Sequence, residues 1–295
     1  MSGAIQCVVL GATGYVGGEL LRLIATHPDM ELAAAVSISR AGEPIASCFP
    51  HLASACGDRV FVKHDDWPDL LAKGARLALF SAAPHGASAP IIKTALAAAA
   101  ARGLEVHVVD SSADFRYAST VEFKTVYGIE HGAPELLADF SCAVPEHADQ
   151  VPGPHVGHPG CFATAVLLAS VPMLGAGVTN AELFVSGITG STGSGKSPQA
   201  GTHHPERHSN LYAYKVLEHR HTPEIKRLAT AASGVDAVIN FIPHSGPFAR
   251  GIYVTVQAKT SRSVSEQELQ RIYGDAYEHS AFVSVVDGPP KLKNV

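Results

Sequence analysis

The stretch of sequence that decides the fold is Ile5-Gln6-Cys7-Val8-Val9-Leu10, an apolar run that leads directly into Gly11-Ala12-Thr13-Gly14-Tyr15-Val16-Gly17. The first run is typical of a buried strand, and the second opens a helix. Glycines at such a junction allow the tight turn and the close backbone approach that a pyrophosphate at a helix N-terminus requires. The spacing is GxxGxxG rather than GxGxxG, so the spacing alone is modest evidence for dinucleotide binding. The position of the motif in a βαβ unit is the stronger evidence. The sequence therefore predicts a dinucleotide-binding unit, with a plain glycine-rich turn as the alternative.

The glycine-rich turn and the end of the second predicted strand supply the expected cofactor contacts. In the turn these residues are Gly11, Thr13, Gly14, Tyr15, Val16 and Gly17. The second strand ends Val36-Ser37-Ile38-Ser39-Arg40, without the acidic residue that binds the ribose 2′-hydroxyl in NAD-selective enzymes. A serine hydroxyl beside a guanidinium suits a 2′-phosphate instead. We therefore expect Ser39 and Arg40 to bind NADP in preference to NAD. The alternative is that Arg40 simply caps a surface strand.

Short β-branched runs alternate with alanine- and leucine-rich helical stretches in the first third of the chain. This alternation is typical of stacked βαβ units around a parallel sheet. The predicted strands are Ile5–Leu10, Glu31–Ile38, Leu77–Ser81 and Val106–Asp110. The predicted helices between them are Gly17–Thr26 and Ala87–Ala101. We expect a Rossmann-like, doubly wound α/β domain over residues 1–145.

The texture of the sequence changes after about Pro145, where glycine- and serine-rich loops and a histidine-rich segment interrupt the periodic runs. The predicted helices are Phe162–Leu174 and Ser265–His279, the latter begun by a capping box at Ser263-Val264-Ser265-Glu266. The predicted strands are Leu183–Ile188, Ala237–Ile242, Gly251–Ala258 and a last one at Phe282–Val286. We expect residues 146–295 to form a second, α+β domain with a mixed sheet.

Composition and charge narrow the class of partner. The 295 residues include 46% hydrophobic and 17% charged residues, the balance of a globular protein with a sizeable core. The formal net charge is −5, and no run of Lys or Arg suggests a nucleic-acid or membrane surface, so we expect small-molecule partners. The five cysteines are scattered without a CxxC pair, and the N-terminus runs at once into a strand without a secretory leader. We therefore expect a cytoplasmic protein with reduced thiols.

A cysteine stands at a polar turn in the sequence His158-Pro159-Gly160-Cys161-Phe162-Ala163-Thr164. The Pro-Gly pair places Cys161 at the start of a predicted helix, where free amide N–H groups and the helix dipole stabilise a thiolate. The alternative, a buried small hydrophobic residue, describes Cys7 in its strand better than a cysteine at such a turn. We expect Cys161 to be a nucleophile.

Six motifs follow one another along nearly the whole chain. They are Gly11–Gly17, Val109–Arg116 (VDSSADFR), the turn Pro159-Gly160-Cys161, Gly187–Lys196, His219–Ile225 (HRHTPEI), and Pro243-His244 with Arg250-Gly251-Ile252. Together they resemble, in order, the motifs of N-acetyl-γ-glutamyl-phosphate reductases, with aspartate-semialdehyde dehydrogenases as more distant relatives. The resemblance implies a Rossmann-like cofactor domain and a catalytic domain that also forms a homodimer or homotetramer. One departure is His158, where the family usually has asparagine.

The resemblance also implies a reaction. A Cys161 thiolate would attack an acyl-phosphate carbonyl, expel phosphate and hold a thioester until hydride from the nicotinamide releases an aldehyde. His219 would be the general base, with His221 beside it, because a histidine near neutral pKa exchanges protons with a thiol. Arg116 would clamp the phosphate, with an ion pair to Asp114 as the alternative. The substrate-binding candidates are Arg116, His221, Arg220 and Arg250, and the glycine-rich loop adds Ser191 and Gly193 as cofactor contacts.

Two further motifs suggest other chemistries. Gly190–Ser197 (GSTGSGKS) matches the P-loop expression GxxxxGK(S/T), which must open a helix at once, whereas Pro198 and Pro205 follow within a polar run. The segment His203–His208 (HHPERH) could suggest zinc, but its proline leaves neither helical nor hairpin ligand spacing. We therefore expect neither a P-loop nor a metal site. The histidine-rich segment is interpreted as a polar loop, and a mobile loop over the substrate is a further interpretation.

Three function classes stay open: an acyl-phosphate reductase, which leads, a P-loop phosphotransferase, and a non-catalytic dinucleotide-binding protein. The third is kept because members of the family continue past the position of Val295 with a segment that returns to the cofactor domain and completes the nicotinamide pocket. For the reductase, N-acetyl-γ-glutamyl phosphate of arginine biosynthesis is the leading substrate. The N-acyl-aminoadipyl phosphate of lysine biosynthesis is the alternative, since one methylene is worth only about 1–3 kcal/mol of discrimination.

Overall fold

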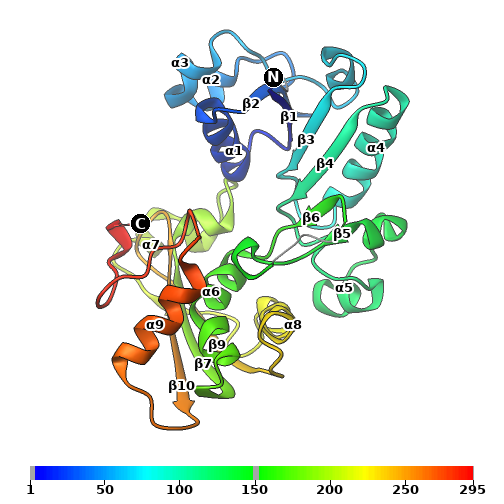
Figure 1. Cartoon of the computed structure of the whole chain (residues 1–295). Coiled ribbons are helices and arrows are strands. Elements are labelled where there is room, and N and C mark those ends of the chain that lie inside the picture. The colour runs from blue at the N-terminus through cyan, green and yellow to red at the C-terminus, as the bar shows by residue number, and fades with distance from the viewer. Residues whose placement is uncertain (1–3, 149–152, 295) are drawn as a thin grey trace. The chain divides into compact units, whose positions relative to one another are not determined.

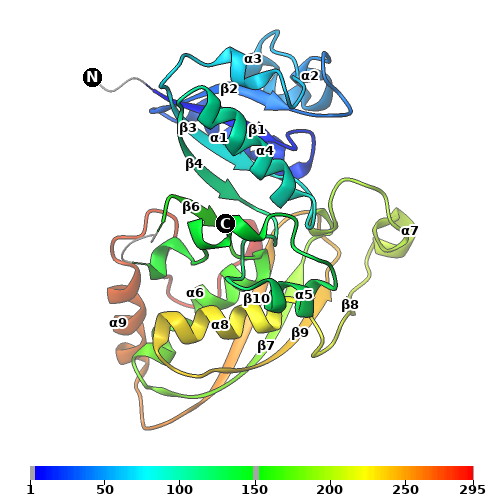
Figure 2. The same cartoon turned by 90° about the vertical axis from the view of Figure 1, so that its right-hand side faces the viewer.

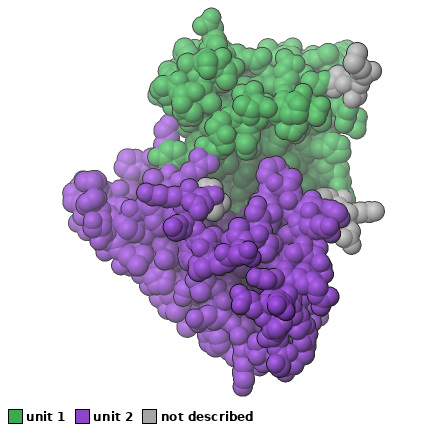
Figure 3. Space-filling view, turned by 60° about the vertical axis from the view of Figure 1, so that its left-hand side comes forward, with its two compact units in different colours: residues 1–142, 151–158 green, residues 143–150, 159–295 purple. Residues whose placement is uncertain are grey.

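A computed structural model of the chain describes residues 4–148 and 153–294. The chain divides into two compact units, which are coloured separately in Figure 3. Unit 1 comprises Met1–Cys142 and Val151–His158, and unit 2 comprises Ala143–Gln150 and Pro159–Val295. Each unit is built around its own sheet.

Unit 1 is built on a six-stranded parallel sheet in the order β2-β1-β3-β4-β6-β5. The strands are β1 (Ile5–Leu10), β2 (Met30–Val36), β3 (Arg76–Ser81), β4 (Glu105–Asp110), β5 (Phe140–Ser141) and β6 (His155–Gly157). The order reverses at β1, because β2 lies on one side of it and β3 on the other. Open α/β sheets bind ligands outside the carboxyl ends of their strands at such a switch point. The glycine-rich turn that follows β1 begins at this place.

Helices cover both faces of this sheet, as Figures 1 and 2 show for α1 (Tyr15–Thr26) and α4 (Ser88–Ala101). Neighbouring residues of β1 belong to two separate cores: Leu10 packs with residues of α4, and Val9 packs with residues of α1. A strand buried on both faces has no polar side to present, so its sequence is continuously apolar instead of alternating. The predicted doubly wound parallel sheet is confirmed.

Unit 2 is built on a four-stranded mixed sheet in the order β10-β7-β9-β8. Its strands are β7 (Thr179–Thr189), β8 (Tyr212–Ala213), β9 (Val238–Ser245) and β10 (Ile252–Thr260). The β7–β9 pair is parallel, and the other two pairs are antiparallel. α6 (Cys161–Gly175) packs on β7 and β10, and α8 (His221–Ser233) packs on β9 and on α6. The predicted mixed sheet of the second domain is confirmed.

α9 (Glu266–Tyr277) completes the hydrogen bonding of α6. Pro172 lies inside α6 and has no N–H to donate to the carbonyl of Leu168, four residues earlier. The Tyr277 hydroxyl donates to that carbonyl at 2.7 Å, so the carbonyl is not left unsatisfied. The helix that begins at Cys161 therefore continues past its internal proline.

Most predicted elements lie within a few residues of their expected bounds, but the last predicted strand, Phe282–Val286, is wrong. These residues belong to no strand in the described part of the chain, and Phe282 is 95% exposed. An apolar run does not reveal whether a neighbouring strand is present to bond with its backbone. The cap of α9 also differs, because the hydroxyl of Ser265, not that of Ser263, accepts the first-turn amide of Glu268 at 3.1 Å.

The remaining helices are short and connect the main elements. They are α2 (Ile45–Cys48), α3 (Ala53–Cys56), α5 (Thr120–Tyr127) and α7 (His204–Arg207). Within residues 4–148 and 153–294, no helix combines the length and apolar character needed to cross a membrane.

Candidate active site

Cys161 is the first residue of α6, and its side chain is exposed. Gly160 is the N-cap and provides no side chain to occupy the amides of the first turn. The N-terminal turn of a helix offers free N–H groups and the positive end of the dipole, which stabilise a thiolate. The structure therefore places Cys161 where a nucleophilic cysteine is favoured.

A buried carboxylate holds the turn before Cys161. Glu224 lies in the first turn of α8, is fully buried, and accepts the Gly160 amide at 2.6 Å through Oε1. A hydrogen bond to a charged acceptor is stronger than one to a neutral acceptor, so this contact fixes the backbone on which the thiol stands. Glu224 belongs to the motif His219–Ile225, but its role was missed because a 64-residue separation from Gly160 gives no local signal in the sequence.

His219 is 8% exposed and lies in an aromatic enclosure. Its ring centroid is 5.9 Å from that of Phe162, 5.7 Å from that of Tyr214 and 5.4 Å from that of Phe241. Burial, and then the positive charges of Arg220 and Lys215, lower the pKa of His219 to about 4. Its imidazole is therefore neutral near neutral pH.

The position of the proton on the neutral His219 ring follows from one hydrogen bond. The backbone N–H of His221 donates to Nδ1 of His219 at 3.2 Å. Because an acceptor nitrogen carries no proton in neutral imidazole, we assign the single ring proton to Nε2. His219 thus offers an N–H donor through Nε2, and a general-base role would require the proton to move to Nδ1. The His221 ring centroid lies 4.8 Å away, so the structure brings these two predicted residues together.

Tyr214 joins this group although sequence analysis did not single it out. Burial first, and then the negative charge of Cys161, raise the pKa of its phenol to about 12, while Arg220 and Arg207 act in the opposite direction. The phenol therefore stays protonated and can donate a hydrogen bond. The backbone amide of Tyr214 donates to Pro243 at the carboxyl half of β9 at 3.0 Å.

The chain between Tyr214 and His219 has an unusual backbone. Lys215 and Leu217 have φ values of 44° and 60°, in the left-handed region that residues with a Cβ rarely adopt. Such conformations persist only where surrounding contacts impose them, and the Leu217 amide is bonded to the Phe241 carbonyl at 3.1 Å. This contact with β9 holds the backbone segment that joins Tyr214 to His219.

The glycine-rich loop after β7 is bonded to the loop before β10. The amides of Gly190, Ser191 and Thr192 donate to the carbonyls of Gly251, Phe248 and Ala249 at 3.0, 3.0 and 2.9 Å. A P-loop needs such amides for phosphate, and it needs a following α-helix, whereas residues 191–194 form only a 3-10 turn. The sequence interpretation that rejects a P-loop is confirmed. Because of these bonds, the loop that contains Ser191 and Gly193 lies against the loop that contains Arg250.

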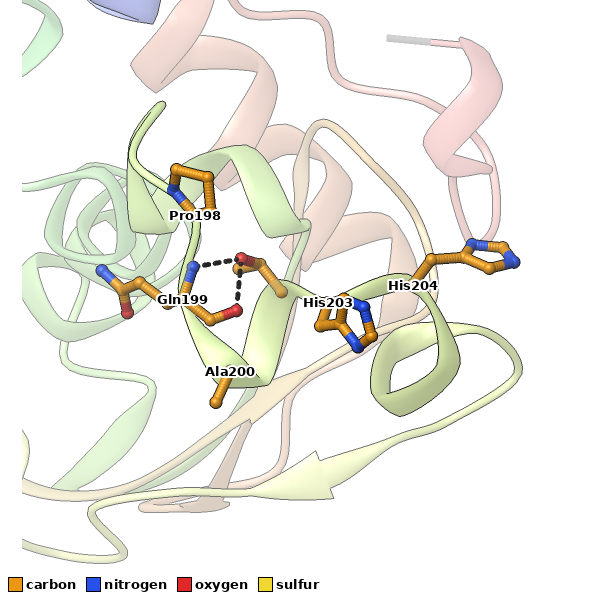
Figure 4. A pocket seen from close by; sticks show the side chains of 6 residues that line it. Pro198, Gln199, Ala200, His203 and His204 are labelled. Atoms are coloured by element: carbon orange, nitrogen blue, oxygen red, sulfur yellow. Dashed lines mark hydrogen bonds between the residues drawn. The ribbon is translucent and has the colours of Figure 1, made fainter.

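A surface pocket lies at the start of the histidine-rich segment. This pocket is lined by Pro198, Gln199, Ala200, Thr202, His203 and His204, shown in Figure 4. Reciprocal bonds between Gln199 and Thr202 close the turn, and the His204 ring points away from His203. Among the described residues, no three His, Cys, Asp or Glu side chains are placed to hold a metal ion.

Arg116 lies in unit 1, where it is 4% exposed. Its Nε donates to the carbonyl of His158 at 2.9 Å, and one terminal nitrogen donates to the carbonyl of Ser111 at 3.1 Å. Asp114 accepts the amides of Gly86 and Ala89 at 2.7 and 2.9 Å. Arg116 is therefore fastened to the residue that lies three positions before Cys161 in the sequence.

The glycine-rich turn after β1 has the geometry that a pyrophosphate requires. A Cβ on Gly11, which has φ +69°, would lie 2.9 Å from the Ala82 backbone, and one on Gly17 would lie 2.6 Å from the Ala12 backbone. Gly14 is the N-cap of α1 and makes no side-chain cap bond, which leaves the first-turn amides of α1 without a side-chain acceptor. The turn therefore fits a dinucleotide phosphate at a helix N-terminus.

The predicted 2′-phosphate residues follow β2. The Arg40 amide donates to the buried Ser37 hydroxyl at 3.3 Å, which closes the turn that contains Ser39. The Arg40 guanidinium is 3.4 Å from the Glu43 carboxylate, and both side chains are exposed. An exposed ion pair of this kind is weak, so Arg40 can rotate toward an anion.

Comparison with known proteins places both units in one family. The family model for the semialdehyde dehydrogenase NAD binding domain matches residues 6–146, and that for the semialdehyde dehydrogenase dimerisation domain matches residues 161–295. Solved aspartate semialdehyde dehydrogenases share the fold at 15% identity. The enzyme from Candida albicans, solved with NADP, has a TM-score of 0.64, with 92% of this chain and 76% of that chain covered. Enzyme II from Vibrio cholerae has a TM-score of 0.65, with 99% and 84% covered.

Curated relatives are more similar in sequence. N-acetyl-gamma-glutamyl-phosphate reductase from Pseudomonas savastanoi pv. phaseolicola is 36% identical, over 96% of this chain and 79% of the relative. The enzyme of the same name from Methanosarcina barkeri is 35% identical, over 99% and 82%. A LysW-L-2-aminoadipate/LysW-L-glutamate phosphate reductase from Ignicoccus hospitalis is 33% identical, over 98% and 82%. The chain belongs to the N-acetyl-γ-glutamyl-phosphate reductases, an oxidoreductase family of the semialdehyde dehydrogenase type.

Proposed function

We propose that this chain reduces N-acetyl-γ-glutamyl phosphate with NADPH to N-acetylglutamate 5-semialdehyde and phosphate, a step of arginine biosynthesis. The observation that carries the proposal is the position of Cys161. It begins α6 after a turn held by buried Glu224, and its charge acts on Tyr214, whose ring lies against His219. Relatives that are 35–36% identical over nearly the whole chain bear the name of this enzyme.

The residues divide the reaction between them. The Cys161 thiolate attacks the carbonyl carbon of the acyl phosphate, and the carbon–oxygen bond to phosphate breaks, which leaves a thioester on sulfur. NADPH, when bound, supplies a hydride to the thioester carbon. The oxyanion then collapses, the carbon–sulfur bond breaks, and the aldehyde leaves as the thiolate is restored. Protonated Tyr214 and the Nε2–H of His219 are suited to donate hydrogen bonds where negative charge develops.

Residues of the first unit are suited to bind the cofactor. We assign the pyrophosphate to the turn Gly11–Gly17, in which neither Gly11 nor Gly17 leaves room for a Cβ. Ser39 and Arg40 would hold the 2′-phosphate. Arg40 would leave its ion pair with the Glu43 carboxylate and bind the more highly charged phosphate. Ser191 and Gly193 are proposed as further cofactor contacts, in the loop pair that also carries Arg250.

The arginines are assigned to the anionic ends of the substrate. Arg116 would bind the phosphate, and Arg220 and Arg250 would bind the carboxylate, with His221 lining the same site. Arg220 acts on both His219 and Tyr214 through its charge, which supports its place beside the reacting atoms. A LysW-linked aminoadipyl or glutamyl phosphate is the second candidate substrate, because a relative 33% identical over 98% of this chain carries that name.

We further propose a homodimer or homotetramer in the cytoplasm. One half of the chain matches a dimerisation domain, and the sheet of unit 2 carries exposed Phe184 and Val238. Single exposed apolar residues are ordinary, so the family match gives this proposal its weight. Five scattered cysteines without a CxxC pair agree with a reducing compartment.

The test is the reverse reaction, NADP reduction with N-acetylglutamate semialdehyde and inorganic phosphate. We expect phosphate-dependent turnover by the full chain that Cys161→Ala abolishes and that the control Cys142→Ala retains. Turnover without phosphate, or a higher kcat/KM with the aminoadipate semialdehyde, would overturn the assigned substrate. NADP binding without turnover in the unmodified chain would overturn the assigned reaction.

A further inference from the structure

Arg207 is a buried cation in the segment that sequence analysis treated as a polar loop. It ends the short helix α7, and it is 8% exposed. Its guanidinium donates to the Ser245 hydroxyl, to the Thr189 carbonyl at 3.4 Å and to the Phe248 carbonyl at 3.5 Å. One side chain thus contacts the ends of β7 and β9 and the loop that precedes β10.

The charge of Arg207 has no counterion in the described part of the chain. Its three acceptors are a hydroxyl and two carbonyls, and its Nε is buried without a hydrogen-bond partner. Burying a charge is costly unless an opposite charge or a full set of hydrogen bonds compensates it. A positive charge fixed in a site that excludes water stabilises a negative charge placed near it more strongly than it would in water.

The field of Arg207 reaches the reacting group. Its positive charge favours the ionised phenol of Tyr214, whereas the negative charge of Cys161 disfavours it. Arg207 is also near Tyr214 by its contacts, because it bonds to Ser245, which pairs with Tyr212 across β8 and β9, two residues before Tyr214. The Tyr214 ring is 5.7 Å from that of His219. Tyr214 is therefore the side chain on which the charges of Arg207 and Cys161 both act.

The contacts of Arg207 also join the loops of the site. Phe248, which it holds, accepts the Ser191 amide at 3.0 Å, and Ala249 accepts the Thr192 amide at 2.9 Å. The clamped loops carry Ser191, Gly193 and Arg250, which are assigned to cofactor and substrate under the proposed function. The planar guanidinium of Arg207 bonds to several acceptors at once, and this arrangement is called its fork. Loss of the fork would loosen this pair of loops.

We propose that Arg207 is a positioning residue whose unpaired positive charge stabilises the Cys161 thiolate while its fork fastens the loops that bind the anionic substrate. The first half of this statement concerns the free protein, and the second rests on the proposed function. Charge and fork can be separated, because lysine keeps the charge without the planar fork, and glutamine removes the charge.

The test of the charge is alkylation of the full chain, without substrate or cofactor, by iodoacetamide across a range of pH. The fraction of Cys161 converted to the thioether is followed by peptide mass spectrometry. For Arg207→Gln we expect the midpoint of the pH profile to rise by about one unit, so that alkylation near neutral pH slows about tenfold. Arg207→Lys and the surface control Arg262→Gln should keep the midpoint of the unmodified chain.

A second variant keeps the test decisive if Arg207→Gln does not fold. Ser245→Ala removes one acceptor of the fork and leaves the charge, so its alkylation profile should match that of the unmodified chain. A midpoint shift in Ser245→Ala or in Arg207→Lys would contradict the electrostatic role. An unshifted profile in folded Arg207→Gln would do the same.

Steady-state kinetics test whether the Arg207 guanidinium holds the binding loops in place. Arg207→Lys should raise KM for the acyl phosphate about tenfold and should raise KM for NADPH as well, because the loosened loops carry residues assigned to both. An unchanged KM for the acyl phosphate would contradict the clamp. If the chain proves inactive on this substrate while the alkylation shift is observed, the proposed function falls and the charge role of Arg207 stands.

Discussion

The glycine-rich turn of unit 1 and the cysteine centre of unit 2 each place a reactive or binding group at a helix N-terminus, but by different means. The turn depends mainly on its own residues: Gly17 lies against the Ala12 backbone and Gly14 leaves the first-turn amides of α1 without a side-chain acceptor, while Gly11 alone is crowded by a distant residue, Ala82. The cysteine turn depends on partners far along the chain: Glu224 holds Gly160, and the charge of Cys161 acts on Tyr214, whose ring lies 5.7 Å from that of His219. The phosphate site proposed at the turn therefore rests mainly on local geometry, whereas the proposed nucleophile rests on tertiary contacts.

The largest effect in this comparison is expected for Tyr214→Phe. Removing one hydrogen-bond donor to a developing oxyanion lowers kcat about 100- to 1000-fold, while NADPH binding should be unchanged. Stopped-flow hydride transfer and cofactor titration check both parts. Exposed Tyr212→Phe is the matched control and should retain its rate. A Tyr214→Phe rate within about twofold of the unmodified chain would remove the phenol from the mechanism.

Glu224→Ala should have the next largest effect. It leaves the Gly160 amide without its acceptor, and an unsatisfied buried donor costs about 1–3 kcal/mol, so kcat should fall about 10- to 100-fold. Glu224→Gln keeps an acceptor oxygen and should recover part of the rate. The control is exposed Glu218→Ala. Equal losses in the alanine and glutamine variants would show that the hydrogen bond does not position the cysteine.

Gly17→Ala tests the glycine-rich turn of unit 1. Its Cβ would lie 2.6 Å from the Ala12 backbone, so the turn must shift. We expect the free energy of unfolding to fall by about 1–3 kcal/mol and the Kd for NADPH to rise about tenfold or more. Alkylation of Cys161 should be unaffected. Gly274→Ala, where an added Cβ meets nothing within 4 Å, is the control and should be neutral or stabilising. Changed thiol reactivity in Gly17→Ala would show that the two centres are not independent.

The smallest effect concerns the pH dependence of stability. The pKa of His219 is about 4 in the folded chain and near 6.5 in the unfolded chain, so the unfolded state binds more protons between these values. The stability that the neutral ring contributes is present above pH 6.5 and is lost as the pH falls toward 4. Thermal unfolding of His219→Gln should show a shallower loss of Tm over this window. An identical slope in both proteins would contradict burial of a neutral imidazole.

The same comparison explains what could be predicted from the sequence. The strand and turn at Ile5–Gly17 and the position of Cys161 at a helix start follow from local patterns, and the structure has both. Tyr214 and Arg207 were missed because their roles depend on the ends of β7 and β9, which no spacing in the sequence reveals. The wrong strand at Phe282–Val286 has the same origin, since a strand needs a partner that its own residues do not specify.

The measurement that tests the central claim most directly is peptide mass spectrometry of the full chain after incubation with N-acetyl-γ-glutamyl phosphate in the absence of NADPH. We predict one N-acetylglutamyl group on the peptide that contains Cys161, absent from Cys161→Ala and released as aldehyde when NADPH is added. Acylation at another residue, or none in a chain that turns over substrate with NADPH, would contradict a thioester on Cys161.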